Sequence, residues 1–216
     1  MDTVSSATSR PIPLSLFVLA IFYGGMVCIA GVLGNKQVAL GPLAVEAGIF
    51  AFLTLVATSS AVAELHGADT AKRLVLFGFI PLVFSILLTM AVLALPPSHD
   101  MPPDRLGAFE MMMGATPRIW IGGICAYGVS QLLNVTLFSR LKASEGQKLL
   151  WLRAGIASVV SQIVDTLIFI TIAFYGEFPI QGLLIGQMIA KVILSILLVP
   201  ALTYGAVLLG RRLDRQ

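Results

Sequence analysis

The fold of this chain is decided by stretches such as residues 149–174, which read LLWLRAGIASVVSQIVDTLIFITIAF. An α-helix needs roughly 20 predominantly apolar residues to cross the hydrocarbon core of a bilayer, and this stretch is long enough to do so. It also carries Ser, Gln and Asp side chains at helical spacing within an otherwise apolar segment. We therefore expect a membrane-spanning helix with one polar face.

Five further apolar runs are spread over the 216 residues of the chain. Together the six runs cover residues 13–34, 38–63, 74–95, 119–138, 149–174 and 180–209. The composition agrees with this pattern, because 57% of the residues are hydrophobic and only 12% are charged. Soluble domains carry roughly 25% charged residues. The sequence predicts an all-α membrane protein, with residues 1–216 forming a single six-transmembrane-helix bundle.

The connections between the runs are short, with one exception. Asn35-Lys36-Gln37 separates the first two runs and predicts a tight helical hairpin, and residues 176–179 join the last two runs in the same way. The long connection 96–118 places Leu106, Phe109 and Met113 at helical spacing, which predicts a short interfacial helix. Pro200 lies inside the last run, which we expect to tilt, kink or extend beyond the bilayer.

The cations are divided unequally between the two sides, and such a bias sets the orientation of a membrane protein. With a cytoplasmic N-terminus, the inner side carries nine Lys and Arg residues and the outer side three. The inner ones are Arg10, Lys72, Arg73, Arg140, Lys142, Lys148, Arg211, Arg212 and Arg215, and the outer ones are Lys36, Arg105 and Arg118. We expect both termini to be cytoplasmic.

Three runs each carry a polar face, and polar groups at membrane depth usually face an internal cavity or one another. The faces consist of Ser158, Ser161, Gln162 and Asp165; of Tyr127, Gln131, Asn134 and Phe138; and of Gln187, Lys191 and Ser195. Asp165 and Lys191 fall at the same depth, about 17 Å from the outer surface. We expect an ion pair between them. It either only locks two helices together, or it also lines a substrate path or couples transport to protons.

Catalytic motifs are missing from the sequence. The chain has no GxxxxGK[ST] and no HExxH, and His66 and His99 lie in different connections on opposite sides. We therefore expect a protein that is not an enzyme and that uses no metal and no cofactor. Glu64, near the inner end of the second run, either belongs to the polar path or forms a solvated helix terminus.

Short motifs along the chain form a recognisable series. They are Gly34-Asn35-Lys36, then Glu64-Leu65-His66-Gly67 with Ala71-Lys72-Arg73, then Gln131-Leu132-Leu133-Asn134-Val135, then Leu150-Trp151-Leu152-Arg153 through Ser161-Gln162-Ile163-Val164-Asp165-Thr166, and finally Gly186-Gln187 with Lys191. This series resembles the VUT family, the queuosine-precursor transporters. The resemblance extends over every run except the third.

The resemblance implies an importer in the bacterial inner membrane that takes up 7-cyano-7-deazaguanine, 7-aminomethyl-7-deazaguanine or a related modified purine. The family is also similar in fold to the substrate-binding S components of ECF-type vitamin transporters. A binding subunit that requires a separate ATPase module is therefore the alternative. The implied partners are a small-molecule purine and the lipid bilayer, not nucleic acid, and a homo-oligomer stays open.

A deazaguanine is flat and presents adjacent N–H donors beside a carbonyl acceptor, so carboxylate, amide and aromatic side chains suit it. The residues expected to bind it are Asp165, Gln162, Gln131, Asn134, Tyr127, Lys191, Gln187, Arg153, Glu64 and Asn35, and Phe138 or Phe169 could also supply an aromatic face. Three places differ from the family pattern: Ser60 and Asn134 replace Asp, and Ala154-Gly155 replaces two Asn. A less hydrogen-bonding or differently charged ligand therefore stays open.

Overall fold

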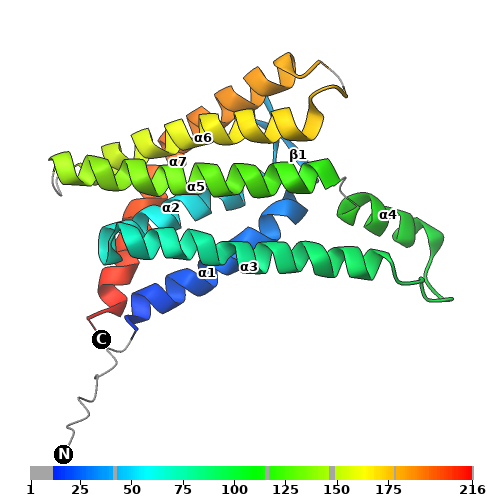
Figure 1. The fold of residues 1–216 in the computed structure, drawn as a ribbon, viewed down its shortest axis with the longest axis horizontal. Coiled ribbons are helices and arrows are strands. Elements are labelled where there is room, and N and C mark those ends of the chain that lie inside the picture. The colour runs from blue at the N-terminus through cyan, green and yellow to red at the C-terminus, as the bar shows by residue number, and fades with distance from the viewer. Residues whose placement is uncertain (1–11, 41–42, 115–116, 146–148, 178, 216) are drawn as a thin grey trace, which may run out of the picture.

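The computed structural model describes residues 12–40, 43–114, 117–145, 149–177 and 179–215. Its elements, in chain order, are α1 (Leu14–Leu33), β1 (Gln37–Leu40), β2 (Leu43–Glu46), α2 (Gly48–His66), α3 (Ala68–Leu93), α4 (Pro103–Met113), α5 (Pro117–Glu145), α6 (Leu150–Phe174) and α7 (Gln181–Leu213) (Figure 1). Among the described residues, six helices, all but α4, are long and apolar enough to cross a membrane. This confirms the all-α, six-helix membrane fold.

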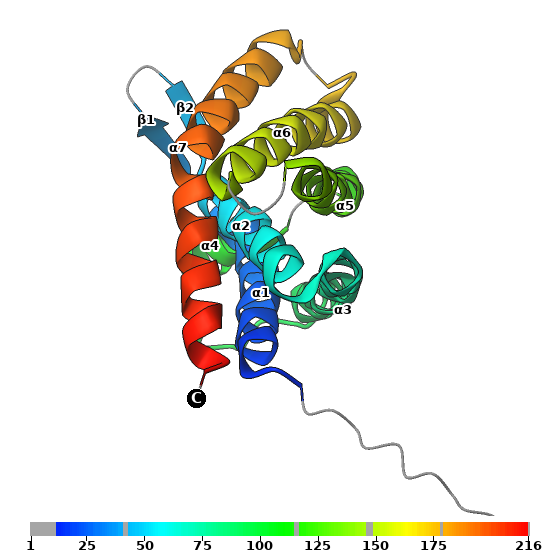
Figure 2. The same ribbon diagram turned by 90° about the vertical axis from the view of Figure 1, so that its left-hand side faces the viewer.

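Helix α2 is the centre of the bundle. In the most apolar stretch of α2, 67% of the residues are buried, against 17% in the corresponding stretch of α1 and 11% in that of α3. Many of its buried residues are small, among them Ala57, Ser59, Ser60 and Ala61, and small residues let neighbouring helices approach closely. Figure 2 shows α2 between α1 and α3 on one side and α5 and α6 on the other, with α7 along its edge.

The outer surfaces of α1 and α3 are apolar. Phe22 on α1 and Phe84 and Met90 on α3 are among the exposed large hydrophobic side chains. Exposed large apolar side chains on two neighbouring helices are unfavourable in water but suit lipid. The exposed apolar side chains of α1 and α3 therefore suit contact with lipid. The buried polar side chains of α2, α5, α6 and α7 lie in the interior of the bundle.

The connection between the first two spanning helices corrects the sequence prediction. We expected a tight helical hairpin at residues 35–37 and a second span over 38–63, but β1 and β2 form an antiparallel hairpin and α2 begins only at Gly48. Val38 pairs with Val45 in that hairpin, and β-branched residues favour strands. Gly41-Pro42 in the sequence also disfavours a continuous helix.

A single glycine accounts for a second difference. We expected the second run to end at residue 63 and the third to begin at residue 74, but α2 ends at His66 and α3 already begins at Ala68. Gly67 between them has a φ of 89°, a conformation that is easy for glycine and unfavourable for other residues. The chain can therefore reverse direction in one residue, and Lys72 and Arg73 lie in the first turns of α3 instead of in a loop.

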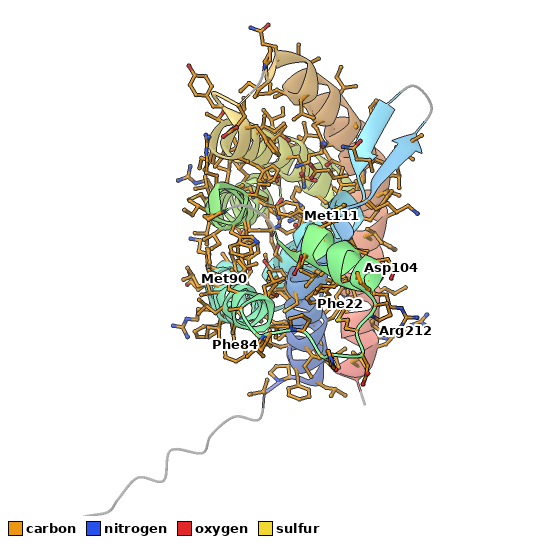
Figure 3. The ribbon with its side chains drawn as sticks, turned by 90° about the vertical axis from the view of Figure 1, so that its right-hand side faces the viewer. Phe22, Phe84, Met90, Asp104, Met111 and Arg212 are labelled. Atoms are coloured by element: carbon orange, nitrogen blue, oxygen red, sulfur yellow. The ribbon has the colours of Figure 1, made fainter. Side chains whose placement is uncertain are left out.

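The long connection contains the expected short helix, α4, at residues 103–113. It lies across one end of the bundle and none of its residues is buried (Figure 3). Met111 is 83% exposed on its outer side. The last run forms one continuous helix, α7, that contains Pro200 and changes direction along its length (Figure 2). A proline inside a helix is a usual cause of such a bend.

The bundle has two distinct ends. At the terminal end, α1 begins and α7 ends, and the Ser15 hydroxyl donates to Asp214 Oδ2 over 2.6 Å and lies 2.7 Å from His66 Nε2. At the opposite, hairpin end lie the β-hairpin, α4 and the connection between α6 and α7 (Figure 1). The Ser15–Asp214 contact thus ties together the first turn of α1 and the residue that follows α7.

Candidate functional site

A buried ion pair lies between α6 and α7. Lys191 Nζ donates to Asp165 Oδ2 over 2.8 Å, and the two side chains are 13% and 6% exposed. The Ser130 hydroxyl of α5 donates to the other carboxylate oxygen over 3.2 Å. The predicted Asp165–Lys191 pair is confirmed. We call Asp165, Lys191 and Ser130 the central cluster.

The pair forms because α6 and α7 are antiparallel neighbours joined by a short connection. Asp165 precedes the end of α6 and Lys191 follows the start of α7, each by about 14 to 15 Å along its helix. A charge at such a depth is unfavourable unless it is paired. The two opposite charges therefore meet at matching depth, and the central cluster joins three helices.

A second polar group lies between α2 and α5. The Ser59 hydroxyl donates to Gln131 Oε1 over 3.2 Å, and the Asn134 amide donates to Ser60 Oγ over 3.0 Å and to Ser59 Oγ over 3.3 Å. All four side chains are fully buried. Ser60, which stands where the resembling family has Asp, is therefore a partner of Asn134, a second position that departs from that family.

Several buried polar atoms in this region have no hydrogen-bond partner among the described residues. They are Nε2 and Oε1 of Gln162, Nε2 of Gln131, Oδ1 of Asn134, and the hydroxyls of Ser158 and Ser195. A buried amide without a partner costs about 1–3 kcal/mol. The bundle interior therefore holds donors and acceptors that a polar molecule between the helices could satisfy.

Glu46, at the end of β2, is a charged neighbour of the central cluster that the sequence did not assign to the site. Burial raises the pKa of its carboxyl above the ordinary value; the Lys191 ammonium lowers it by a smaller amount, and the Asp165 carboxylate raises it. The β-hairpin thus brings an acidic group toward the ion pair from the hairpin end. Lys191 also lies 5.9 Å from the centre of the Phe52 ring.

A third polar group, the inner cluster, consists of Glu64, Lys142 and Arg153 near the terminal end. Glu64 Oε2 lies 3.2 Å from Lys142 Nζ and 3.4 Å from Arg153 Nη1, although neither contact has hydrogen-bond geometry. The Glu64 side chain is 3% exposed, so it is not a solvated helix terminus. The Arg153 guanidinium stacks on Phe138, 5.1 Å from the ring centre.

The other expected site residues lie elsewhere. The Tyr127 hydroxyl donates to the Val75 carbonyl over 2.9 Å and lies 3.0 Å from the Tyr23 hydroxyl, from which it accepts, so Tyr127 faces α1 and α3 instead of the central cluster. Asn35 is exposed and caps the end of α1 through the carbonyls of Gly31 and Val32. Gln187 is buried, one turn before Lys191 on α7.

Six spanning helices around buried carboxylate, ammonium and amide groups define a multi-pass membrane protein with a polar interior, the architecture of a transporter. Residues 46–205 match the family described as "Putative vitamin uptake transporter". The chain belongs to this vitamin uptake transporter family.

One curated relative comes from Bacillus subtilis (strain 168) and is named "Probable queuosine precursor transporter". It is 32% identical to this chain over 146 residues, which make up 67% of this chain and 62% of the relative. The match therefore spans less than two thirds of the relative's length. No solved structure matches the chain.

Proposed function

We propose that the chain imports a queuosine precursor, 7-cyano-7-deazaguanine, 7-aminomethyl-7-deazaguanine or a related modified purine, across the bacterial inner membrane. The observation that carries this proposal is the set of buried amide atoms without a hydrogen-bond partner, namely both amide atoms of Gln162, Nε2 of Gln131 and Oδ1 of Asn134, in a bundle that also holds the Asp165–Lys191 pair. Family membership and the name of the Bacillus relative support the substrate class.

The chemistry of the interior suits a deazaguanine. The Asp165 carboxylate can accept the two adjacent N–H donors of the base, and the Lys191 ammonium can then donate to its carbonyl oxygen. The amides of Gln162 and Gln131 can satisfy the remaining ring edge, because their free atoms supply both donors and acceptors. Phe52, beside Lys191, offers an aromatic face for stacking.

The orientation proposed is the one the cation count favours, with the terminal end in the cytoplasm and residues 1–216 acting as one membrane domain. Lys72, Arg73, Arg140, Lys142, Arg211, Arg212 and Arg215 belong to helix ends or turns at the terminal end, whereas Arg10 and Lys148 lie outside the described residues. A reporter fused after Gln216 should be active only in the cytoplasm. An externally active reporter would contradict this orientation.

Uptake of labelled 7-cyano-7-deazaguanine tests the function, in bacterial cells that can neither make nor import this base. Cells expressing the chain should accumulate label, and Asp165→Asn and Gln162→Ala should each lower uptake at least tenfold. Asp69→Asn and Gln181→Ala are matched controls, because the same changes fall on exposed residues at helix ends. Uptake that is unchanged in both interior variants would overturn the proposed site.

Liposomes that contain only this chain address the energy source. Accumulation in these liposomes indicates a stand-alone carrier, whereas binding without transport indicates a subunit that needs an ATPase module. The purified chain is required for this experiment, because a module present in cells would conceal the difference.

A further inference from the structure

A cavity of about 260 Å³ opens beside the inner cluster at the terminal end. Its polar and aromatic lining comes from Glu64 at the end of α2, Trp151 at the start of α6, and Tyr204 and Arg211 near the end of α7, and three aliphatic side chains complete it. Trp151 and Tyr204 are 61% and 63% exposed. The cavity is therefore accessible, with a buried carboxylate in its wall and two aromatic rings near its opening.

The polar groups beside this cavity are incompletely satisfied. Glu64 Oε2 is buried and receives no hydrogen bond of good geometry, even though Lys142 and Arg153 are close. The Arg153 side chain is 1% exposed, and its three guanidinium nitrogens have no hydrogen-bond acceptor among the described residues. Buried polar groups rarely stay without a hydrogen-bond partner. An acceptor on Glu64 and donors on Arg153 that lack partners therefore occur together in the inner cluster.

The cavity is separate from the central cluster. Arg153 and Asp165 lie on the same helix, α6, and are about 18 Å apart along its axis. Glu64 lies beside Arg153, so one base cannot contact the Asp165 and Glu64 carboxylates at the same time. The carboxylates Asp165 and Glu64 thus have similar surroundings at two depths, since each is paired with cations from neighbouring helices.

We infer that this cavity beside the inner cluster is a second binding site, for a flat heterocyclic base with adjacent N–H donors. The inference rests on the proposed function, in which the cavity is a second, cytoplasm-facing binding site for the same substrate. Glu64 accepts the N–H donors, and the Trp151 and Tyr204 rings contact the face of the base. The volume is slightly below the roughly 300 Å³ at which pockets for drug-sized ligands begin, which suits a single base.

An anionic lipid headgroup is the competing occupant, because Arg211 and two exposed aromatic residues near a helix end also suit lipid. The Glu64 carboxylate argues against it. A phosphate diester offers no donor to the buried acceptor Glu64 Oε2, whereas the N–H edge of a base does. The carboxylate in the wall therefore favours the base.

Tryptophan fluorescence of the purified full-length protein tests this inference. The chain has two tryptophans, Trp120 at the hairpin end and Trp151 in the cavity wall. Trp120→Phe leaves Trp151 as the single reporter, and Trp151→Phe leaves Trp120. Titration with 7-cyano-7-deazaguanine should quench the first variant with saturation and leave the second unchanged. Quenching of neither variant would overturn the inference.

Substitutions in the Trp120→Phe background locate the site. Tyr204→Leu should weaken binding roughly fivefold or more, as expected when one base–aromatic contact is lost. Tyr175→Leu, at the hairpin end and 69% exposed, is the matched control and should bind normally. Glu64→Gln should weaken binding about tenfold. If it unfolds instead, the Tyr204 and Tyr175 pair decides the question alone.

Two further measurements separate the possible failures. Asp165→Asn should abolish uptake yet keep Trp151 quenching, because the cavity beside the inner cluster is independent of the central cluster. Uptake without quenching contradicts the second site and leaves the proposed function intact; quenching without uptake supports the second site and contradicts the proposed function. A Trp151 response to phosphatidylglycerol vesicles, but not to the base, would assign the cavity to lipid and overturn the inference.

Discussion

Removal of the Asp165 carboxylate distinguishes a pair that only joins two helices from one that also acts on substrate. In Asp165→Asn, the Lys191 ammonium stays 13% exposed but loses the carboxylate that it contacts at 2.8 Å. Loss of one member of a buried ion pair costs about 3–5 kcal/mol, mainly because the remaining charge is uncompensated. We expect the free energy of unfolding to fall by an amount in this range.

The double variant Asp165→Asn, Lys191→Met should recover most of this loss. Replacement of both members by less polar groups is often neutral, because no buried charge remains. Stepwise unfolding of the purified protein in micelles by sodium dodecyl sulfate should therefore give a coupling energy of about 2–3 kcal/mol or more. The exposed Arg118–Glu177 pair, at 3.0 Å, is the control and should give less than about 1 kcal/mol.

Uptake measured on the same variants completes the test. If the pair only locks α6 to α7, the double variant regains both stability and transport. If Asp165 binds substrate, the double variant regains stability and stays inactive, and this is the result we expect. A coupling energy below about 0.6 kcal/mol, the average for an ordinary interhelical hydrogen bond in a membrane protein, would refute the reasoning.

Three further predictions concern packing and pH. Gly78→Ala should lower the free energy of unfolding by about 1–3 kcal/mol, because the added Cβ would collide with the Tyr127 hydroxyl. Gly25→Ala is the control and should not lower the free energy of unfolding, because the space beside Gly25 is open. Equal stability of the two variants would contradict this packing. Burial raises the pKa of Glu46 above its ordinary 4.5, so the ionised form opposes folding at neutral pH. Thermal unfolding should show Glu46→Gln to be more stable than the wild type at pH 7.5 and equal to it at pH 4, with exposed Glu110→Gln as the unchanged control; a difference that persists at pH 4 would refute this origin. Hydrogen bonds from Ser15 lower the pKa of Asp214 below its ordinary 3.8, so they stabilise the fold above that pH and less as the pH falls through the lowered value. Ser15→Ala should therefore be less stable than the wild type at pH 6 and approach it near pH 3, and a gap that is constant with pH would mean that Ser15 acts in another way.

Depth along a helix could be predicted from the sequence, because the rise per residue is fixed and the connection between α6 and α7 is short. That is why the Asp165–Lys191 contact was correctly expected. The direction of a side chain around the bundle was less predictable. Tyr127 shares a helical face with Gln131, but it lies one turn away and points toward Tyr23 and Val75. The neighbour that each part of a face meets depends on helix packing, which a single helix does not encode.

The β-hairpin shows a second limit of the sequence. Residues 38–45 are as apolar as a spanning helix, so hydropathy alone assigned them, and Glu46 with them, to the second run. In the structure residues 37–40 and 43–46 pair as strands, and this hairpin carries Glu46 toward the central cluster. An apolar strand pair and an apolar membrane-spanning helix can have the same composition. Only the turn residues between the two strands distinguish the strand pair from the helix.

Among the residues that the structure describes, the buried ion pairs join different helices, and this has a consequence for transport. Asp165 and Lys191 connect α6 to α7, while Glu64, Lys142 and Arg153 connect α2, α5 and α6. Because each of these carboxylates already lies beside a cation, a base that binds at either proposed site would compete with that cation for the carboxylate. Such competition weakens a contact between helices, so binding at either proposed site would loosen the helix packing around it.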